Sequence, residues 1–265
     1  MNKSRRLLGF GLALIVPWAL GSSALAAPAA GKPLPSIVLV HGAFADGSSW
    51  DRVVPLLLAK GYPVVALHQS LSSLAEDVAA TRRAIEAQPG DVVLVGHSYG
   101  GAVITEAGNH PKVKSLVYVA AFGPDTNESI NDLGRGQPPP VWATALRVDS
   151  GGYGWLTRSA VLEHFAQDLP EAEAGLLAVK QGPINTKNFD DKIKLAAWHS
   201  RPSFYLRATS DHMIVPEAQA VMAKRMGASV TSVASSHVPM LSHPGDVASI
   251  IVRAAATSRP AVAQR

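Results

Sequence analysis

The chain has 265 residues, of which 47% are hydrophobic and 17% are charged, which is enough for one domain with a sizeable core. It contains no cysteine, which excludes disulfide bonds, thiol catalysis and cysteine-ligated metals. The formal net charge is +4, and no basic stripe suggests a nucleic-acid partner.

Residues 1–26 have the order of a secretory signal peptide. Lys3, Arg5 and Arg6 precede an apolar stretch over residues 7–20, and small residues then lead to an A-x-A site that ends at Ala26. We therefore expect cleavage after Ala26 and an exported protein, periplasmic or secreted. A retained membrane anchor is the alternative, but the stretch is short for a span, so no stable anchor is expected. Because paired arginines occur in both kinds of signal, the sequence does not distinguish export by the Sec route from export by the twin-arginine route.

Short apolar runs alternate with helical patterns through the rest of the chain. The runs are continuous rather than alternating, as in strands that are covered on both faces. They predict six strands, at residues 36–40, 63–67, 92–95, 115–120, 203–208 and 229–233. Helices are expected at residues 50–60, 74–85 and 217–226, the second with a capping box at Ser73 to Glu76. The fold class is therefore α/β, with a mostly parallel sheet of about six strands flanked by helices.

Residues from about 123 to 200 interrupt this alternation. They contain no good strand candidate, several helical pieces and large aromatic residues, among them Trp142, Tyr153, Trp155, Phe165 and Trp198. A long insertion between two strands is usually a lid or a functional loop system. We expect a helical cap over a pocket, and surface helices packed for stability are the alternative.

The stretch GHSYGG follows the strand at residues 92–95 and precedes a helix. Gly-x-Ser-x-Gly in this context is the nucleophile elbow, a strained turn that projects a serine from the edge of the sheet. Gly96 and Gly100 occupy the positions where side chains would collide, and Ser98 is the nucleophile. The helix that begins near Tyr99 presents free backbone N–H groups, which favour an oxyanion.

The serine needs a base, and the base needs an orienting acid. In a strand–elbow–helix fold these follow in the order Ser, Asp or Glu, His. Asp211 lies just past the strand at 203–208 and His237 just past the strand at 229–233, so these are the predicted acid and base. His243 is the alternative base, and His212 is read as a rim or exposed residue.

The loop after the first strand, His41-Gly42-Ala43-Phe44, is expected to supply a second oxyanion donor. We predict the N–H groups of Ala43 and Tyr99 as the oxyanion hole, with Phe44 as the alternative to Ala43. His41 is interpreted as a structural residue. The candidate walls of the substrate pocket are Phe44, Tyr99, Phe122 and Met240, for each of which ordinary core packing is the alternative.

With these residues in place, the chain clearly resembles the α/β-hydrolase superfamily. It looks closest to the cap-bearing group that includes plant methylesterases and hydroxynitrile lyases. The matching motifs are HGAFADGSSW (41–50), GHSYGG (96–101), ATSDHMIVPE (208–217) and SSHVPMLSHP (235–244). The resemblance implies that residues 27–265 form one hydrolase domain with a cap at about 123–200. Carried over by position, its nucleophile, acid and base fall on Ser98, Asp211 and His237.

The resemblance also separates two chemistries. The lyases of the group have a lysine directly after the catalytic histidine and a threonine after the histidine of the first loop. This chain has Val238 and Gly42 at those positions, which favours the esterase branch.

The leading hypothesis is a secreted serine hydrolase that cleaves small carboxylic esters through an acyl-enzyme, without metal or cofactor. A lactonase or a cofactor-free perhydrolase would use the same triad. A non-catalytic protein that binds a small ligand is the alternative from another class, because fold alone does not decide function. The natural substrate and the oligomeric state are left open.

Overall fold

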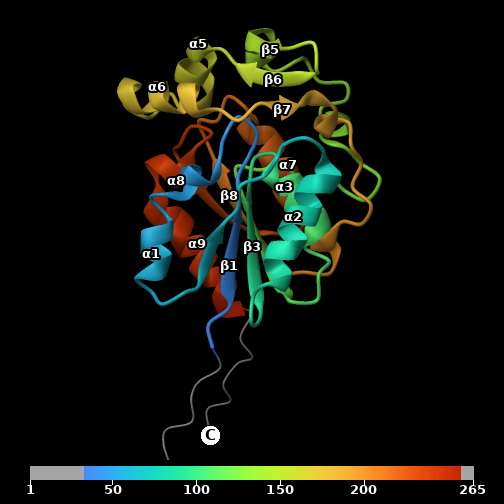
Figure 1. Cartoon of the computed structure of the whole chain (residues 1–265), viewed down its shortest axis with the longest axis vertical. Helices are drawn as coiled ribbons and strands as arrows, with labels where there is room; N and C mark the ends of the chain where they lie inside the picture. Colours follow the sequence, from blue (N-terminus) through green and yellow to red (C-terminus); the bar gives the residue numbers. More distant parts are fainter. Residues whose placement is uncertain (1–32, 258–265) are drawn as a thin grey trace, which may run out of the picture. The chain divides into compact units, whose positions relative to one another are not determined.

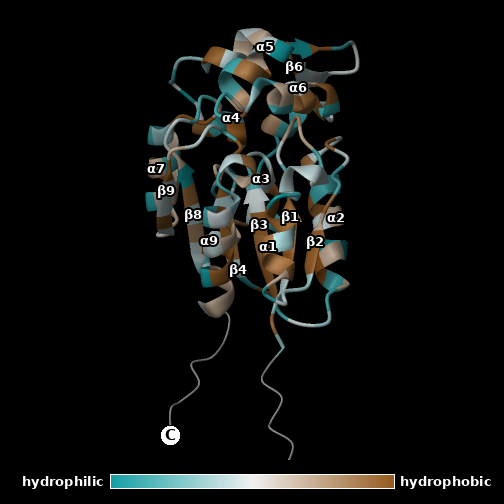
Figure 2. Ribbon diagram, turned by 90° about the vertical axis from the view of Figure 1, so that its left-hand side faces the viewer, coloured by the Kyte–Doolittle hydropathy of each residue, from teal (hydrophilic) through white to brown (hydrophobic). Residues whose placement is uncertain are grey.

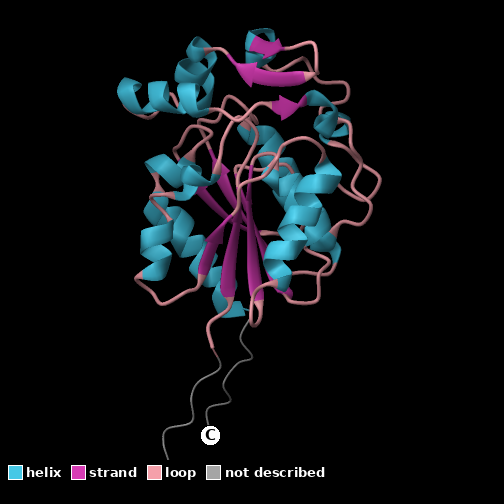
Figure 3. Ribbon diagram, viewed as in Figure 1, coloured by secondary structure: helices cyan, strands magenta, loops and turns pink. Residues whose placement is uncertain are grey.

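The computed structural model describes residues 33–257, and the predicted signal peptide at residues 1–26 lies outside this range. A six-stranded parallel sheet forms the centre, in the order β2-β1-β3-β4-β8-β9 (Figures 1 and 3). The strands are β1 (Ser36–Val40), β2 (Val64–Ala66), β3 (Val92–His97), β4 (Val113–Val119), β8 (Ser203–Ala208) and β9 (Ser229–Val233). All six predicted strands are confirmed, and the doubly covered parallel sheet is the predicted fold class.

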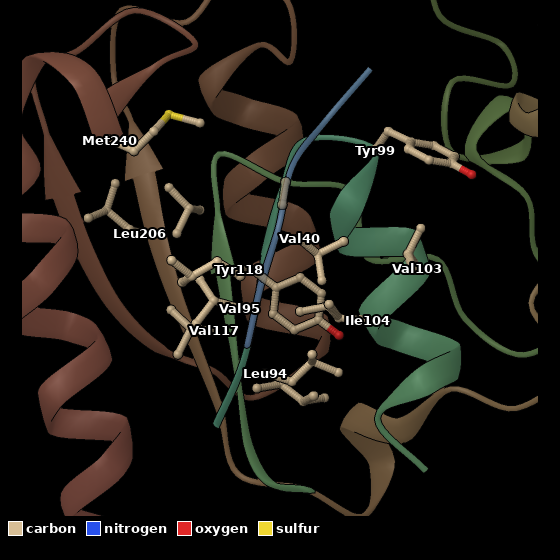
Figure 4. Packing of buried hydrophobic residues seen from close by; sticks show 14 of the residues in the cluster. Val40, Leu94, Val95, Tyr99, Val103, Ile104, Val117, Tyr118, Leu206 and Met240 are labelled. Carbon is tan, nitrogen blue, oxygen red and sulfur yellow. The ribbon is translucent and has the colours of Figure 1, made fainter. Parts of the chain in front are cut away.

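Hydrophobic burial on both faces explains why these segments are strands. Every residue of β1 and of β3 is buried, and most of the central strands are coloured hydrophobic in Figure 2. Helices α1 (Val54–Leu58) and α9 (Pro244–Thr257) cover one face, while α2 (Leu74–Glu86) and α3 (Gly100–Ala107) cover the other (Figure 1). On the α3 side, Val40, Leu94 and Tyr118 lie beside Ile104 (Figure 4).

The helix boundaries follow local signals. The side chain of Ser73 accepts a hydrogen bond from the N–H of Glu76 and caps α2 where the sequence predicts it. Three helices, α7 (Pro216–Arg225), α8 (Pro239–Ser242) and α9, begin with proline, whose missing N–H costs nothing in the first turn. The helix predicted at 50–60 is instead a 3₁₀ turn, η1 (Gly47–Trp50), followed by the short α1 with Pro55 in its first turn.

Residues 123–200 form an insertion between β4 and β8, called the cap from here on. Its helical pieces are α4 (Ile130–Leu133), η2 (Val141–Ala145), α5 (Arg158–Ala160), the π-helical η3 (Val161–Phe165), α6 (Glu171–Lys180), η4 (Thr186–Phe189) and η5 (Ala197–His199). The cap also contains an antiparallel sheet that the sequence does not predict, made of β5 (Leu146–Val148), β6 (Tyr153–Leu156) and β7 (Ile184–Asn185). These strands are two to four residues long, too short to leave a hydrophobic pattern.

Within residues 33–257, no helix is both long enough and apolar enough to cross a bilayer.

Candidate active site

Ser98 lies in the tight turn between β3 and α3. Its backbone has a φ of 51°, in the left-handed region that a non-glycine residue adopts only under constraint. The two neighbouring glycines show the constraint. A Cβ at Gly96 would lie 2.5 Å from the carbonyl oxygen of Gly100, and a Cβ at Gly100 would lie 2.6 Å from that of Val40. The turn therefore needs glycine at both positions, as the elbow motif predicts.

The structure brings the three predicted catalytic side chains into one hydrogen-bonded chain. His237 Nδ1 lies 2.7 Å from Asp211 Oδ2, and His237 Nε2 lies 2.8 Å from Ser98 Oγ. Asp211 and His237 come from the loops after β8 and β9, at the carboxyl edge of the sheet. Because a carboxylate can only accept, Nδ1–H donates to Asp211, and Nε2 is left to accept the proton of the serine hydroxyl.

Asp211 is fixed by donors on both of its oxygens. Oδ1 accepts from the N–H groups of Met213 and Ile214 at 2.7 and 3.0 Å, and Oδ2 accepts from Gln219 Nε2 at 2.8 Å. Gln219, fully buried on α7, is a site residue that sequence reasoning misses. No local motif marks it, because its role depends on how α7 packs against the loop.

His97, directly before Ser98, hydrogen-bonds to the backbone of His237, the predicted base. Its Nε2–H donates to the carbonyl oxygen of His237 at 2.8 Å, and the two rings lie 4.8 Å apart. Burial, followed by the neighbouring His237, holds the pKa of His97 well below its usual range, so this ring is neutral. From the cap, Phe165 packs edge-on against His237 with the ring centres 5.2 Å apart. The imidazole of His237 thus packs against one ring from the core and one from the cap.

The backbone N–H groups predicted to form the oxyanion hole are free to donate a hydrogen bond. No hydrogen bond among the residues the structure describes uses the N–H of Ala43, Phe44 or Tyr99, so each is available. A Cβ at Gly42 would lie 2.7 Å from Ser98 Cβ, which shows how closely this loop approaches the nucleophile. The geometry agrees with Ala43 and Tyr99 as donors and leaves Phe44 as the alternative.

A small cavity lies beside the triad, between the core and the cap. The space open to the centre of a water molecule is about 20 Å³, room for about one water. Its lining residues are Phe44, Ala45, Asp46, Ser48, Ser49, His97, Phe165, Leu177, Lys180, Val238 and Leu241. Ser98 is only 7% exposed, so the nucleophile position is largely covered in this conformation.

Of the predicted pocket walls, Phe44 lines this cavity, but Tyr99, Phe122 and Met240 do not. Met240 is fully buried and belongs to the hydrophobic core cluster drawn in Figure 4. Phe122 packs against the same core. For both, core packing describes the placement better than a pocket wall.

The other histidines near the site lie outside the hydrogen-bonded chain. His41 is buried and accepts from the N–H of Gln69 at 3.0 Å, as a structural residue does. His212 is exposed at the rim, with its Nδ1 3.4 Å from that of His164 in the cap. His243 contacts Ser242 and not the nucleophile. In the described range, 33–257, no group of three or more His, Cys, Asp or Glu side chains is placed to hold a metal ion.

The cap forms hydrogen bonds with the loops that carry Asp211 and His237. Asp168 Oδ2 accepts from the N–H of Ser236, beside His237, at 2.9 Å. Gln167 Nε2 donates to the carbonyl oxygen of Ser210, beside Asp211, at 2.7 Å. Sequence reasoning does not identify these two cap residues either, because their hydrogen-bond partners lie far along the chain.

Comparison with known proteins agrees with this architecture. The sequence pattern of the Alpha/beta hydrolase family matches residues 37–250. A pyrethroid hydrolase of Sphingobium wenxiniae is 28% identical over 243 aligned positions, covering 81% of this chain and 85% of that protein. Methylesterase 1 of Arabidopsis thaliana is 25% identical over 257 positions, covering 82% of this chain and 95% of that protein. A carbendazim hydrolyzing esterase of a Nocardioides species is 36% identical over 170 positions, covering 57% and 67%.

Solved structures show the same fold. A crystal structure of a pyrethroid hydrolase superposes with a TM-score of 0.75 at 24% identity, covering 84% of this chain and 98% of that one. Polyneuridine aldehyde esterase superposes with a TM-score of 0.73 at 20% identity, covering 83% and 98%. The chain belongs to the alpha/beta hydrolase family. Within it, the protein is a carboxylic ester hydrolase.

Proposed function

We propose that the protein cleaves small carboxylic esters with Ser98 as nucleophile, His237 as general base and Asp211 as the acid that orients it. The observation that carries this proposal is the unbroken chain of short hydrogen bonds, 2.7 and 2.8 Å long, from Asp211 through His237 to Ser98. Nucleophile, base and orienting acid in hydrogen-bond reach of one another are the signature of an activated serine.

The chemistry follows from the placement of each group. Ser98 Oγ attacks the ester carbonyl while His237 Nε2 takes its proton, and Asp211 stabilises the imidazolium that forms. The N–H groups of Ala43 and Tyr99 stabilise the negative oxygen of the tetrahedral intermediate. The imidazolium then protonates the leaving alcohol, and an acyl-enzyme remains on Ser98. Water, deprotonated by His237, releases the acid and restores the serine.

The apolar side chains around the cavity support a substrate with an apolar group. The walls of the cavity include Phe44, Phe165, Leu177, Val238 and Leu241. The relatives are named for small molecules, a pyrethroid and carbendazim among them, and others are named methylesterases. We propose an ester of that size class, with the cap selecting the acyl or alcohol group.

We also propose that the protein is exported. The support is the order of basic, apolar and small residues that ends at Ala26, all of it in the sequence outside the described residues. Expression of the full chain in a bacterium, followed by N-terminal sequencing of the periplasmic or secreted product, tests this. A product that begins at Ala27 supports export, and a product retained at full length contradicts it.

The test of the activity is hydrolysis of p-nitrophenyl esters from acetate to dodecanoate. We expect turnover that peaks at one chain length and disappears in Ser98→Ala. Ser249→Ala, which removes an exposed hydroxyl on α9, is the matched control and should retain full activity. A folded protein without turnover on any ester, or a Ser98→Ala variant as active as the control, contradicts the proposal. Tight ligand binding without turnover would favour a binding protein instead.

A further inference from the structure

The side chain of Tyr99, next to the nucleophile, belongs to a buried polar network that the proposed mechanism does not use. Its ring is fully buried, and its hydroxyl donates to Asp77 Oδ2 on α2 at 2.9 Å. The same hydroxyl accepts from Asn188 Nδ2, in the cap, at 3.1 Å. Figure 4 shows the Tyr99 ring beyond the start of α3, directed away from the other labelled core residues. Both hydrogen-bonding capacities of the hydroxyl are therefore occupied, one by the core and one by the cap.

Asp77 is the anchor on the core side. It is fully buried in the first turn of α2, where the helix dipole favours a carboxylate. Its Oδ1 accepts from the N–H of Leu71 at 3.1 Å, and Leu71 has a φ of 55°, in the left-handed region. Asp77 forms no ion pair within residues 33–257, so it depends on these neutral donors. A buried carboxylate held only by hydrogen bonds needs all of them.

Asn188 is the anchor on the cap side. It is 1% exposed, and its amide nitrogen donates both to Tyr99 and to the carbonyl oxygen of Leu71, the latter at 3.2 Å. The N–H of Asn185 donates to the same carbonyl at 2.9 Å. Phe189, the next cap residue, packs edge-on against the Tyr99 ring with the centres 6.4 Å apart. Two consecutive cap residues thus clamp the hydroxyl and the ring of Tyr99.

Tyr99 also carries a backbone N–H that is free to serve the oxyanion, directly after a serine in a strained conformation. A side chain that is anchored at its tip restricts the position of its own backbone. We propose that Tyr99 is a positioning residue: Asp77 and Asn188 hold its hydroxyl, and this fixes the oxyanion donor and makes its placement depend on the seating of the cap. The inference rests on the proposed serine hydrolase function.

Tyr99→Phe removes the hydroxyl and leaves the ring. Removal of an oxyanion donor costs about 100-fold or more in kcat, so partial misplacement of this one should lower kcat about tenfold. KM should change little, because the oxyanion exists only in the transition state. Tyr118→Phe is the matched control. Tyr118 is equally buried and its hydroxyl pairs with Thr105 on α3, but within residues 33–257 this hydroxyl forms no hydrogen bond with the cap or with Tyr99.

Asn188→Ala tests the cap side and keeps Tyr99 intact. It should also lower kcat, and its effect should vanish in the Tyr99→Phe background if Asn188 acts through the hydroxyl. This variant also serves if Tyr99→Phe fails to fold. The kcat is measured on the best p-nitrophenyl ester and divided by the number of active sites, titrated with diethyl p-nitrophenyl phosphate. This division removes any loss of folded protein, so a merely structural role would leave the ratio unchanged.

A fall in kcat per titrated site for Tyr99→Phe and Asn188→Ala, but not for Tyr118→Phe, supports the inference. Values within twofold of the control for both variants overturn it and leave the proposed function standing. A wild-type protein that neither turns over an ester nor reacts with the phosphate overturns the proposed function, and this inference with it.

Discussion

Replacement of Asp211 by asparagine should remove most of the activity, and the structure shows why. Two backbone N–H groups, those of Met213 and Ile214, donate to Oδ1. The amide oxygen of an asparagine must take that position, because an NH₂ group there would face two donors. The NH₂ group then occupies the position of Oδ2, opposite His237 Nδ1. Gln219 cannot turn to relieve this, since its own Oε1 accepts from the N–H of Ala208 at 3.0 Å.

A donor opposite Nδ1 forces His237 into the wrong tautomer. Nδ1 must then accept, the proton moves to Nε2, and Nε2 cannot take the proton of Ser98. The same substitution in serine proteases leaves the geometry intact and lowers kcat about 10⁴-fold, and we expect a similar loss here. That loss corresponds to a barrier about 5 kcal/mol higher.

The assay is kcat on the best p-nitrophenyl ester, with Ser98→Ala as the lower limit. Asp168→Asn is the matched control, because it makes the same change in a carboxylate that contacts the His237 loop but not the imidazole. We expect that control to stay within about threefold of the wild type, since an amide oxygen can still accept from the N–H of Ser236. A folded Asp211→Asn variant that loses less than tenfold would refute the reasoning about the tautomer.

Three further results are expected. Gly42→Ala places a methyl group 2.7 Å from the β-carbon of the nucleophile and should lower kcat/KM about 100-fold, whereas Gly245→Ala, with nothing within 4 Å, should be neutral in the same assay. Asp168→Ala, unlike Asp168→Asn, removes the acceptor of the Ser236 N–H and should lower kcat by disordering the loop of the base; equal kinetics for the two variants would contradict this. The lowered pKa of His97 keeps its ring neutral in the folded protein, so below a pH of about 6.5 only the unfolded chain binds this proton. The free energy of unfolding should therefore decrease as the pH is lowered, by up to about 1.4 kcal/mol per pH unit. Urea unfolding at pH 7, 6 and 5 should show a smaller fall for His97→Gln, and parallel falls would refute the assignment.

The sheet and the predicted triad residues could be read from the sequence because each leaves a local signal. A continuous apolar run marks a buried strand, glycines on both sides of Ser98 mark the elbow, and the strand ends place Asp211 and His237. The three side chains meet because the strands are parallel, so that their carboxyl ends lie at the same edge of the sheet.

The supporting residues could not be read in this way. Asn188 lies 89 positions from Tyr99, and Asp168 lies 68 positions from Ser236. A single polar residue in a cap leaves no pattern, because its partner is set by how the cap packs. The same limit applies to Met240, whose direction depends on a four-residue helix rather than on a repeating pattern.

The cap therefore cannot be a passive cover. It bonds to each of the three loops that carry the triad, through Asn188 to the residue after the nucleophile, Gln167 to the residue before the acid, and Asp168 to the residue before the base. A substrate has to displace part of the cap, because the cavity has room for about one water. Any substrate that prevents the cap from returning would leave the catalytic loops less well held, and would react slowly even when bound. Selectivity among esters should consequently appear in kcat as well as in KM, since binding energy that reseats the cap is realised in the transition state.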